Sequence, residues 1–340
     1  MNLLSTPACI YGAVTRLRNR LYDRSFLQSE NVSLPVISIG NLSAGGNGKT
    51  PLCITLAHEL LKMRRRPVVL SRGYGGRERG PRVVSTTDDW QRVGDEPLMM
   101  ARFHSLPVVV SRDRLLGAEY ICANELGDVI LLDDGFQHRR LARELDIVSV
   151  DVSSARARAA FVRGELLPAG RFREDRDAAF RRIGLLVFSS RQAKAPEGLE
   201  ELYRIVPSGL PVVETSLQPQ GVFSLSGGEP HAPGKIAAFC GLANPEGFFA
   251  TLESLGFEIM ARRSLRDHGI ADKRLLSGLR REASGLSLVC TEKDAIKLDP
   301  QAAADVFVLR ATTSQPLVLK SGGQYEEGSW QALLAPLFAA

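Results

Sequence analysis

The chain has 340 residues, with 43 Lys and Arg against 38 Asp and Glu and a formal net charge of +5. This length exceeds one ordinary core and predicts two domains. No apolar run approaches the roughly 20 residues of a membrane span, and five scattered cysteines without a C-x-x-C pair exclude a disulfide framework and a zinc site. We therefore expect a protein of the reducing cytosol, without a signal peptide because Pro7 and Tyr11 interrupt the weakly apolar start.

Residues 8–24 have the pattern of an amphipathic helix. The apolar face consists of Ile10, Val14, Leu17 and Leu21, and the basic stripe beside it of Arg16, Arg20 and Arg24. Such a helix either lies in a membrane interface or packs its apolar face on the domain that follows. The spacing alone favours neither alternative.

A phosphate-binding loop is predicted after the apolar run that ends at Gly40. A glycine-rich turn leads to Lys49 and Thr50, which open an amphipathic segment, so strand, loop and helix follow in the order that a P-loop requires. Glycine-rich backbone and a helix N-terminus both present N–H groups to phosphate. The predicted nucleotide-binding residues are Ser43, Ala44, Gly45, Gly46, Asn47, Gly48, Lys49 and Thr50. Ser43 stands where the usual pattern has its first glycine.

Two carboxylates follow a later apolar run, at Asp133 and Asp134. A strand end with acidic side chains is the second half of a P-loop site, where one carboxylate holds Mg²⁺ with the Thr50 hydroxyl. The sequence therefore predicts ATP and Mg²⁺ as cofactors, and leaves open which of the two aspartates contacts the metal. The alternative to a metal site is a structural Asp-Asp-Gly turn without a ligand.

Strand-like runs alternate with helical patterns through the first 205 residues, which predicts an α/β fold with a mostly parallel sheet. Residues 206–234 are rich in proline around two strand-like runs, so we expect a two-stranded linker there. A second, smaller α/β domain is predicted for residues 235–340. Within it, Thr291-Glu292-Lys293-Asp294 superficially fits a guanine-reading motif, but it lies beyond the linker and is discounted.

Other candidate site residues come from loops and helix starts. Arg72 and Tyr74 follow a predicted strand, as site residues do in α/β folds. Asp95 opens a helix and is either a catalytic base or a cap. His268 is a lone histidine, a type that is more often structural than catalytic, although Asp267 lies beside it.

Together these segments resemble the tetraacyldisaccharide 4′-kinase family of lipid A biosynthesis. The resemblance rests on Ser38 to Pro51, Ser71 to Gly75, Val93 to Pro97, Asp133 to His138, Leu166 to Gly170 with Arg173-Glu174, Phe239 to Pro245, Asp267-His268 and Cys290 to Lys297. It implies transfer of the ATP γ-phosphoryl to the 4′-hydroxyl of tetraacyldisaccharide 1-phosphate. It also implies two α/β/α domains joined by a two-stranded linker.

The resemblance further implies roles for individual residues. Asp95 matches the proposed base, His268 the histidine paired with it, and Lys49 the P-loop lysine. Substrate binding is implied for Arg72, Tyr74, Arg114, His138, Arg173 and Glu174. The family loop usually reads Phe-Pro-Asp-His-His, and here it is Leu265-Arg266-Asp267-His268-Gly269, so the second histidine is absent.

The implied partners are an acylated glucosamine disaccharide 1-phosphate and the cytoplasmic face of the bacterial inner membrane, with residues 8–24 at its surface. We expect a monomer that associates peripherally with the membrane. We do not expect nucleic-acid binding, because few aromatic residues accompany the arginine clusters. Two alternatives remain: a soluble P-loop kinase acting on another sugar or nucleoside, and a GTPase-like switch that binds guanine.

Overall fold

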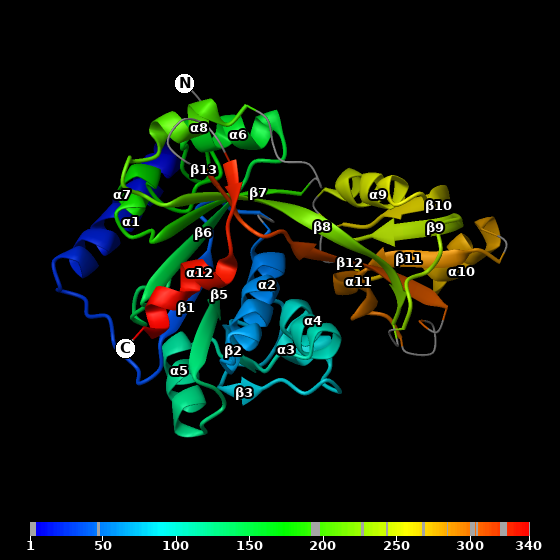
Figure 1. Cartoon of the computed structure of the whole chain (residues 1–340), viewed down its shortest axis with the longest axis horizontal. Helices are drawn as coiled ribbons and strands as arrows, with labels where there is room; N and C mark the ends of the chain where they lie inside the picture. The colour runs from blue at the N-terminus through cyan, green and yellow to red at the C-terminus, as the bar shows by residue number, and fades with distance from the viewer. Residues whose placement is uncertain are drawn as a thin grey trace.

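The computed structural model describes residues 5–45, 48–191, 198–225, 228–242, 244–266, 269–283, 285–299, 303, 305–319 and 325–339. The strands form one sheet in the order β10-β9-β11-β12-β8-β7-β6-β1-β5-β2-β4-β3, with β13 and β14 attached to one side of β8. Two groups of helices cover this sheet toward its two ends (Figure 1). We call residues up to α8 the first unit, and β9 to β12 with their helices the second unit.

The first unit is a parallel sheet with helices on both faces, as predicted. Its strands are β1 (Val36–Gly40), β2 (Pro67–Ser71), β3 (Arg82–Val83), β4 (Val108–Val110), β5 (Val129–Asp133), β6 (Leu145–Asp151) and β7 (Leu185–Ser190). Its helices are α1 (Ser5–Asp23), α2 (Lys49–Lys62), α3 (Trp90–Val93), α4 (Asp95–His104), α5 (Arg114–Ala123), α6 (Ala155–Arg163), α7 (Arg176–Phe180) and α8 (Glu200–Ile205). Only β3 pairs antiparallel, with β4.

Burial of the central strands explains their near-continuous apolar sequences. All five residues of β1, β2 and β5 are buried, as expected where helices cover both faces of a parallel sheet. Along β5, Val129 and Leu131 pack in the core under α2, whereas Ile130 and Leu132 pack in the core under α5. This central stack fixes the strand ends that carry the candidate site.

The second unit is a smaller sheet with its own helices. It contains β9 (Lys235–Cys240), β10 (Glu258–Ser264), β11 (Ser287–Thr291) and β12 (Val306–Thr313), with α9 (Pro245–Ser254), α10 (Lys273–Glu282) and α11 (Glu292–Ala295). These four strands pair parallel with one another, and β12 also pairs antiparallel with β8 (Val212–Ser224). The α/β fold of both parts agrees with the prediction.

The connection between the units differs in detail from the expected linker. The two strand-like runs between 206 and 234 form the single strand β8, whose first residues pair with β7 and whose last pair with β12. The register with β12 shifts between Arg310 and Ala311, which face Gly221 and Pro219. A bulge tolerates proline inside a strand, so Pro219 does not interrupt β8. The two-stranded connection is therefore the β8–β12 pair, visible as two long arrows in Figure 1.

The C-terminal segment returns to the first unit, whereas the sequence analysis grouped it with the second. It contains β13 (Leu317–Leu319), β14 (Tyr325–Glu327), α12 (Trp330–Leu334) and a 3₁₀ turn (Ala335–Phe338). Trp330 is fully buried in the core under α2 and donates its indole N–H to Ser314 O at 3.0 Å. Gln331 reaches Glu59 of α2 at 3.0 Å.

Helix α1 packs by its small and polar side and exposes its apolar side. Gly12 and Asn19 are the buried positions, whereas Ile10, Val14 and Leu17 are about three-fifths exposed, at 62%, 62% and 60%. Within the described part of the chain, three residues of the predicted apolar face are therefore exposed, and the fourth, Leu21, is half-buried. None of the helices in it is long and apolar enough to cross a membrane.

Candidate active site

The predicted phosphate-binding loop joins β1 to α2 as expected. Gly45 and Gly48 have φ angles of 114° and 72°, a region that favours glycine. Helix α2 starts at Lys49, and its N-cap Gly48 makes no side-chain capping hydrogen bond. Gly48 has no side chain to cap the first N–H groups of α2, and N–H groups at such a helix start can bind an anion. Ser43 and Ala44 lie in the same loop, and Gly46 and Asn47 fall outside the described residues.

Asp134 lies between two cations at the end of β5. Lys49 Nζ is 2.7 Å from Asp134 Oδ1, and Arg173 donates to the same oxygen at 2.9 Å. Burial alone would raise the pKa of Asp134, but Lys49 and Arg173 lower it below its ordinary value. Two predicted site residues, Lys49 and Arg173, thus meet at one carboxylate.

Asp133, unlike Asp134, lies among oxygen-bearing side chains. It is buried and accepts a hydrogen bond from Ser71 Oγ at 3.1 Å. Burial, then the negative charges of Glu96 and Asp134, raise the pKa of Asp133 to about 7. Glu96 in turn accepts a hydrogen bond from the Thr50 hydroxyl at 3.2 Å. Glu96 was not predicted as a site residue; its position beside Asp95 in the sequence was the available signal.

This oxygen-rich cluster of Thr50, Glu96 and Asp133 suits a hard divalent cation. Crowded carboxylates carry excess negative charge, which a cation would neutralise. Among the described residues, no group of three or more His, Cys, Asp or Glu side chains is placed to hold a metal alone. Mg²⁺ in phosphate-transfer sites takes only one or two carboxylates and completes its shell with phosphate and water. The donor set therefore fits Mg²⁺ bound together with a nucleotide.

Asp95 is the first residue of α4 and does not cap it. The N-cap is Gly94, with φ at 96°, and Asp95 Oδ1 accepts from the next backbone N–H, that of Glu96, at 2.9 Å. Asp95 is 5% exposed, and its Oδ2 lies 3.1 Å from Lys297 Nζ in the second unit. Asp267 and His268, the predicted partner of Asp95, lie outside the described residues.

Several of the predicted substrate-binding residues gather as a positively charged group near the two aspartates. Burial, then the charge of Arg72, lowers the pKa of Arg114. Burial, then Arg114, lowers the pKa of His138 to about 4. His138 Nε2 and Arg114 Nε are buried and accept or donate no hydrogen bond within the described structure. Tyr74 is exposed beside Arg72. The positive charges of Arg72 and Arg114, beside the neutral His138 with its unused Nε2, suit an anionic ligand.

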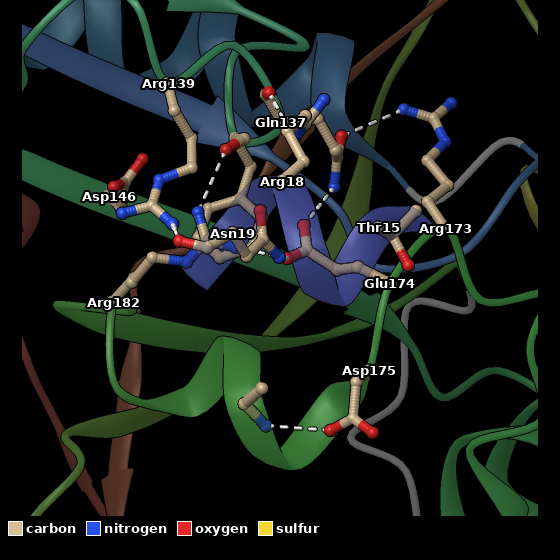
Figure 2. A network of polar contacts seen from close by, with 12 residues as sticks. Thr15, Arg18, Asn19, Gln137, Arg139, Asp146, Arg173, Glu174, Asp175 and Arg182 are labelled. Atoms are coloured by element: carbon tan, nitrogen blue, oxygen red, sulfur yellow. Dashed lines mark hydrogen bonds and ion pairs between the residues drawn. The ribbon is translucent and has the colours of Figure 1, made fainter. Parts of the chain in front are cut away.

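Glu174 lies differently, inside a polar network under helix α1 (Figure 2). It is 2% exposed and accepts hydrogen bonds from Asn19 Nδ2 at 2.9 Å and Gln137 Nε2 at 3.1 Å, and it also pairs with Arg182. Its carboxylate oxygens are thus held by protein donors. Asn19 and Gln137 were not predicted as site residues; Gln137 lies within the Asp133 to His138 segment, which was the available signal, whereas Asn19 lies in no matching segment.

The Thr291-Glu292-Lys293-Asp294 motif forms a capped turn at the contact between the units. Thr291 Oγ1 accepts from Asp294 N at 3.1 Å, and Asp294 Oδ2 accepts from Gly241 N at 3.0 Å. Lys293 Nζ lies 3.3 Å from Glu96 Oε1. The motif thus places two lysines, Lys293 and Lys297, against the start of α4, a role that its sequence did not suggest.

Comparisons with known proteins are consistent with this geometry. The family model described as Tetraacyldisaccharide-1-P 4′-kinase matches residues 1–321. A tetraacyldisaccharide 4′-kinase of Anaeromyxobacter dehalogenans (strain 2CP-C) is 40% identical over 309 residues, covering 86% of this chain and 80% of that protein. One of Chlorobium limicola is 37% identical over 310 residues, covering 87% and 86%. A solved structure of LpxK from Aquifex aeolicus in complex with ATP superposes with a TM-score of 0.76 at 29% identity, covering 97% of this chain and 96% of that one.

Proposed function

The chain belongs to the tetraacyldisaccharide-1-P 4′-kinase family, and from this premise we propose how its residues divide the work of the reaction. The enzyme is an ATP-dependent kinase that transfers the γ-phosphoryl group to the 4′-hydroxyl of tetraacyldisaccharide 1-phosphate. The observation that carries the proposal is that Lys49 contacts Asp134 and Thr50 contacts Glu96, the residue next to Asp95.

Nucleotide phosphates bind at the start of α2. The N–H groups of its first turn and of the loop glycines donate hydrogen bonds to the phosphate oxygens, and Lys49 supplies a positive charge to the β- and γ-phosphates. Lys49 pairs with Asp134 at 2.7 Å, so the carboxylate holds the ammonium near the phosphate position. Arg173 donates to the same Asp134 oxygen and adds positive charge on the acceptor side.

The residues that would hold Mg²⁺ are Thr50 and Asp133, with Glu96 beside them. When bound, the ion neutralises phosphate charge and aligns the transferred group. Asp133 is a better metal ligand than Asp134, because Lys49 and Arg173 already engage the Asp134 carboxylate.

Asp95 is the general base. Its carboxylate accepts the proton of the 4′-hydroxyl as the oxygen attacks, a role that contributes about 10²- to 10⁴-fold in comparable enzymes. The adjacent residue Glu96 reaches Thr50 at the metal position, so Asp95 lies next to the phosphate end of α2. The positive charges of Arg72 and Arg114, together with the neutral imidazole of His138, bind the anionic acceptor.

Helix α1 places the enzyme on the inner-membrane surface, at its cytoplasmic face. Its exposed apolar residues Ile10, Val14 and Leu17 lie beside exposed arginines, and this combination binds the boundary between headgroups and acyl chains. Phe26, 75% exposed just after the helix, extends the apolar surface. An acceptor that carries four acyl chains resides in that same boundary.

Incubation with ATP, Mg²⁺ and tetraacyldisaccharide 1-phosphate in detergent tests the proposal. We expect a bis-phosphorylated lipid by mass spectrometry. Parallel reactions with glucosamine, uridine and adenosine test the soluble-kinase alternative, and GTP in place of ATP tests the switch alternative. Phosphorylation of a soluble acceptor without lipid product would replace this proposal.

A further inference from the structure

The two units touch through polar pairs between α4 and the segment 291–297. Three side chains of this segment reach α4: Glu292 contacts His104 at 3.0 Å, Lys293 contacts Glu96 at 3.3 Å, and Lys297 contacts Asp95 at 3.1 Å. We call these pairs the interunit contact. Phe103 of α4 packs against the cores of both units, so an apolar contact accompanies the polar pairs.

Lys297 is the most deeply buried member of the interunit contact. Its side chain is 1% exposed, against 16% for Lys293, and the Asp95 side chain is 6% exposed. Within the described structure Lys297 Nζ forms one ion pair, with Asp95, and makes no hydrogen bond of good geometry. Burying an ammonium group is costly unless a partner compensates its charge. Asp95 is therefore the ion-pair partner that compensates the buried charge of Lys297.

Lys297 in turn restrains Asp95, because both carboxylate oxygens of Asp95 are engaged. Oδ1 accepts from Glu96 N at 2.9 Å, and Oδ2 faces Lys297 at 3.1 Å. These two contacts together fix the rotation of the carboxylate. One comes from α4 itself, and the other from the second unit.

We propose that Lys297 is a positioning residue for phosphoryl transfer, orienting the Asp95 carboxylate across the interunit contact. The inference rests on the proposed function, in which Asp95 is the base. It follows that the base is complete only while the segment 291–297 is docked on α4. The second unit therefore contributes to the chemical step, in addition to any role in binding.

The kinetics of Lys297→Met test this inference, because methionine keeps the length of the side chain and removes its charge. We expect kcat to fall by about 10²-fold, the scale of losing an oriented base, with the KM for ATP changed by less than about threefold. Lys297→Arg, which keeps the charge, should retain more kcat than Lys297→Met. Lys273→Met is the matched control, because Lys273 is an exposed lysine of the second unit, paired with Asp299 at 3.4 Å; its kcat should equal that of the wild type.

A double-mutant cycle with Asp95→Asn separates positioning from a general structural effect. If Lys297 acts through Asp95, adding Lys297→Met to Asp95→Asn changes kcat by less than about threefold. A further loss of about tenfold or more would overturn the inference. Because the double variant removes both charges of this ion pair together, it decides the question even where Lys297→Met alone does not fold.

The activity of the wild-type protein distinguishes a failure of the inference about Lys297 from a failure of the proposed function. A wild-type protein that phosphorylates the lipid, with Lys297→Met at wild-type kcat, overturns the inference about Lys297 and leaves the proposed function standing. A wild-type protein that forms no lipid product overturns the proposed function, and this inference with it.

Discussion

Lys49 Nζ and Asp134 Oδ1 lie 2.7 Å apart, so the P-loop lysine is held by a strand-end carboxylate before any phosphate arrives. Arg173 shares the same carboxylate. A lysine held in this way loses little side-chain freedom when a nucleotide binds, since its orientation is already set.

Replacing Lys49 by methionine should lower kcat/KM for ATP by about 10²- to 10³-fold, the usual cost of removing one preorganised electrostatic donor. Steady-state kinetics over a range of ATP concentrations measure this change. Lys62→Met in the same helix is the control, because the Lys62 side chain is exposed and pairs with Glu59 at the other end of α2. Comparable losses in both variants would contradict a special role for Lys49.

The environment of His138 predicts that the free energy of unfolding decreases in acid. Its pKa is lowered to about 4 by burial and by Arg114, so between about pH 6.5 and 4 the unfolded chain binds a proton that the folded chain does not. The free energy of unfolding therefore falls as the pH decreases through this window. His138→Asn, which does not titrate, should lose on the order of 2 kcal/mol less than the wild type between pH 7 and 4.5.

Urea denaturation at several pH values measures this difference. The two proteins are compared first at pH 7.5, where His138 is neutral and any gap reports packing alone. Parallel acid slopes would contradict the buried, cation-flanked environment of His138.

The exposed apolar face of α1 predicts membrane binding that depends on three residues. Ile10→Asp, Val14→Asp and Leu17→Asp together should abolish cosedimentation with anionic phospholipid vesicles, because they place charge where apolar contact is needed. Stability should change by less than about 1 kcal/mol, since all three side chains are exposed. Leu116→Asp, at an exposed leucine of α5, is the matched control. Undiminished vesicle binding of the triple variant would rule out α1 as the contact.

The hydrogen bond from Asn19 to Glu174 should stabilise the packing of α1 on the rest of the first unit. Asn19→Ala removes a donor at 2.9 Å from a buried carboxylate, which should lower the free energy of unfolding by about 1–3 kcal/mol. Chemical denaturation measures the loss. Asn124→Ala, at an exposed position where the amide bonds only to the Tyr120 carbonyl, is expected to cost less. Equal effects would show that the Glu174 contact adds nothing.

Local sequence was sufficient to predict the phosphate-binding loop, because strand, glycine-rich turn and helix are neighbours in the chain. Asp133 and Asp134 were predicted together, but their neighbours Lys49, Arg173 and Glu96, which give the two carboxylates different environments, come from other segments. Glu96 and Lys293 are 197 residues apart, and no local pattern encodes their meeting. Trp330 docks on α2 for reasons of shape and burial that appear only once the sheet is assembled.

The strand β8 has a mechanical consequence for the whole enzyme. Its hydrogen bonds to β7 and then to β12 make it a single backbone ribbon that enters both units. A narrow two-stranded ribbon twists more readily than a broad sheet, and the bulge opposite Gly221, whose φ is 124°, adds a point of compliance. Rotation of one unit against the other can therefore proceed as torsion of this ribbon with its ladder intact, which would carry Lys297 toward or away from Asp95 along a defined arc.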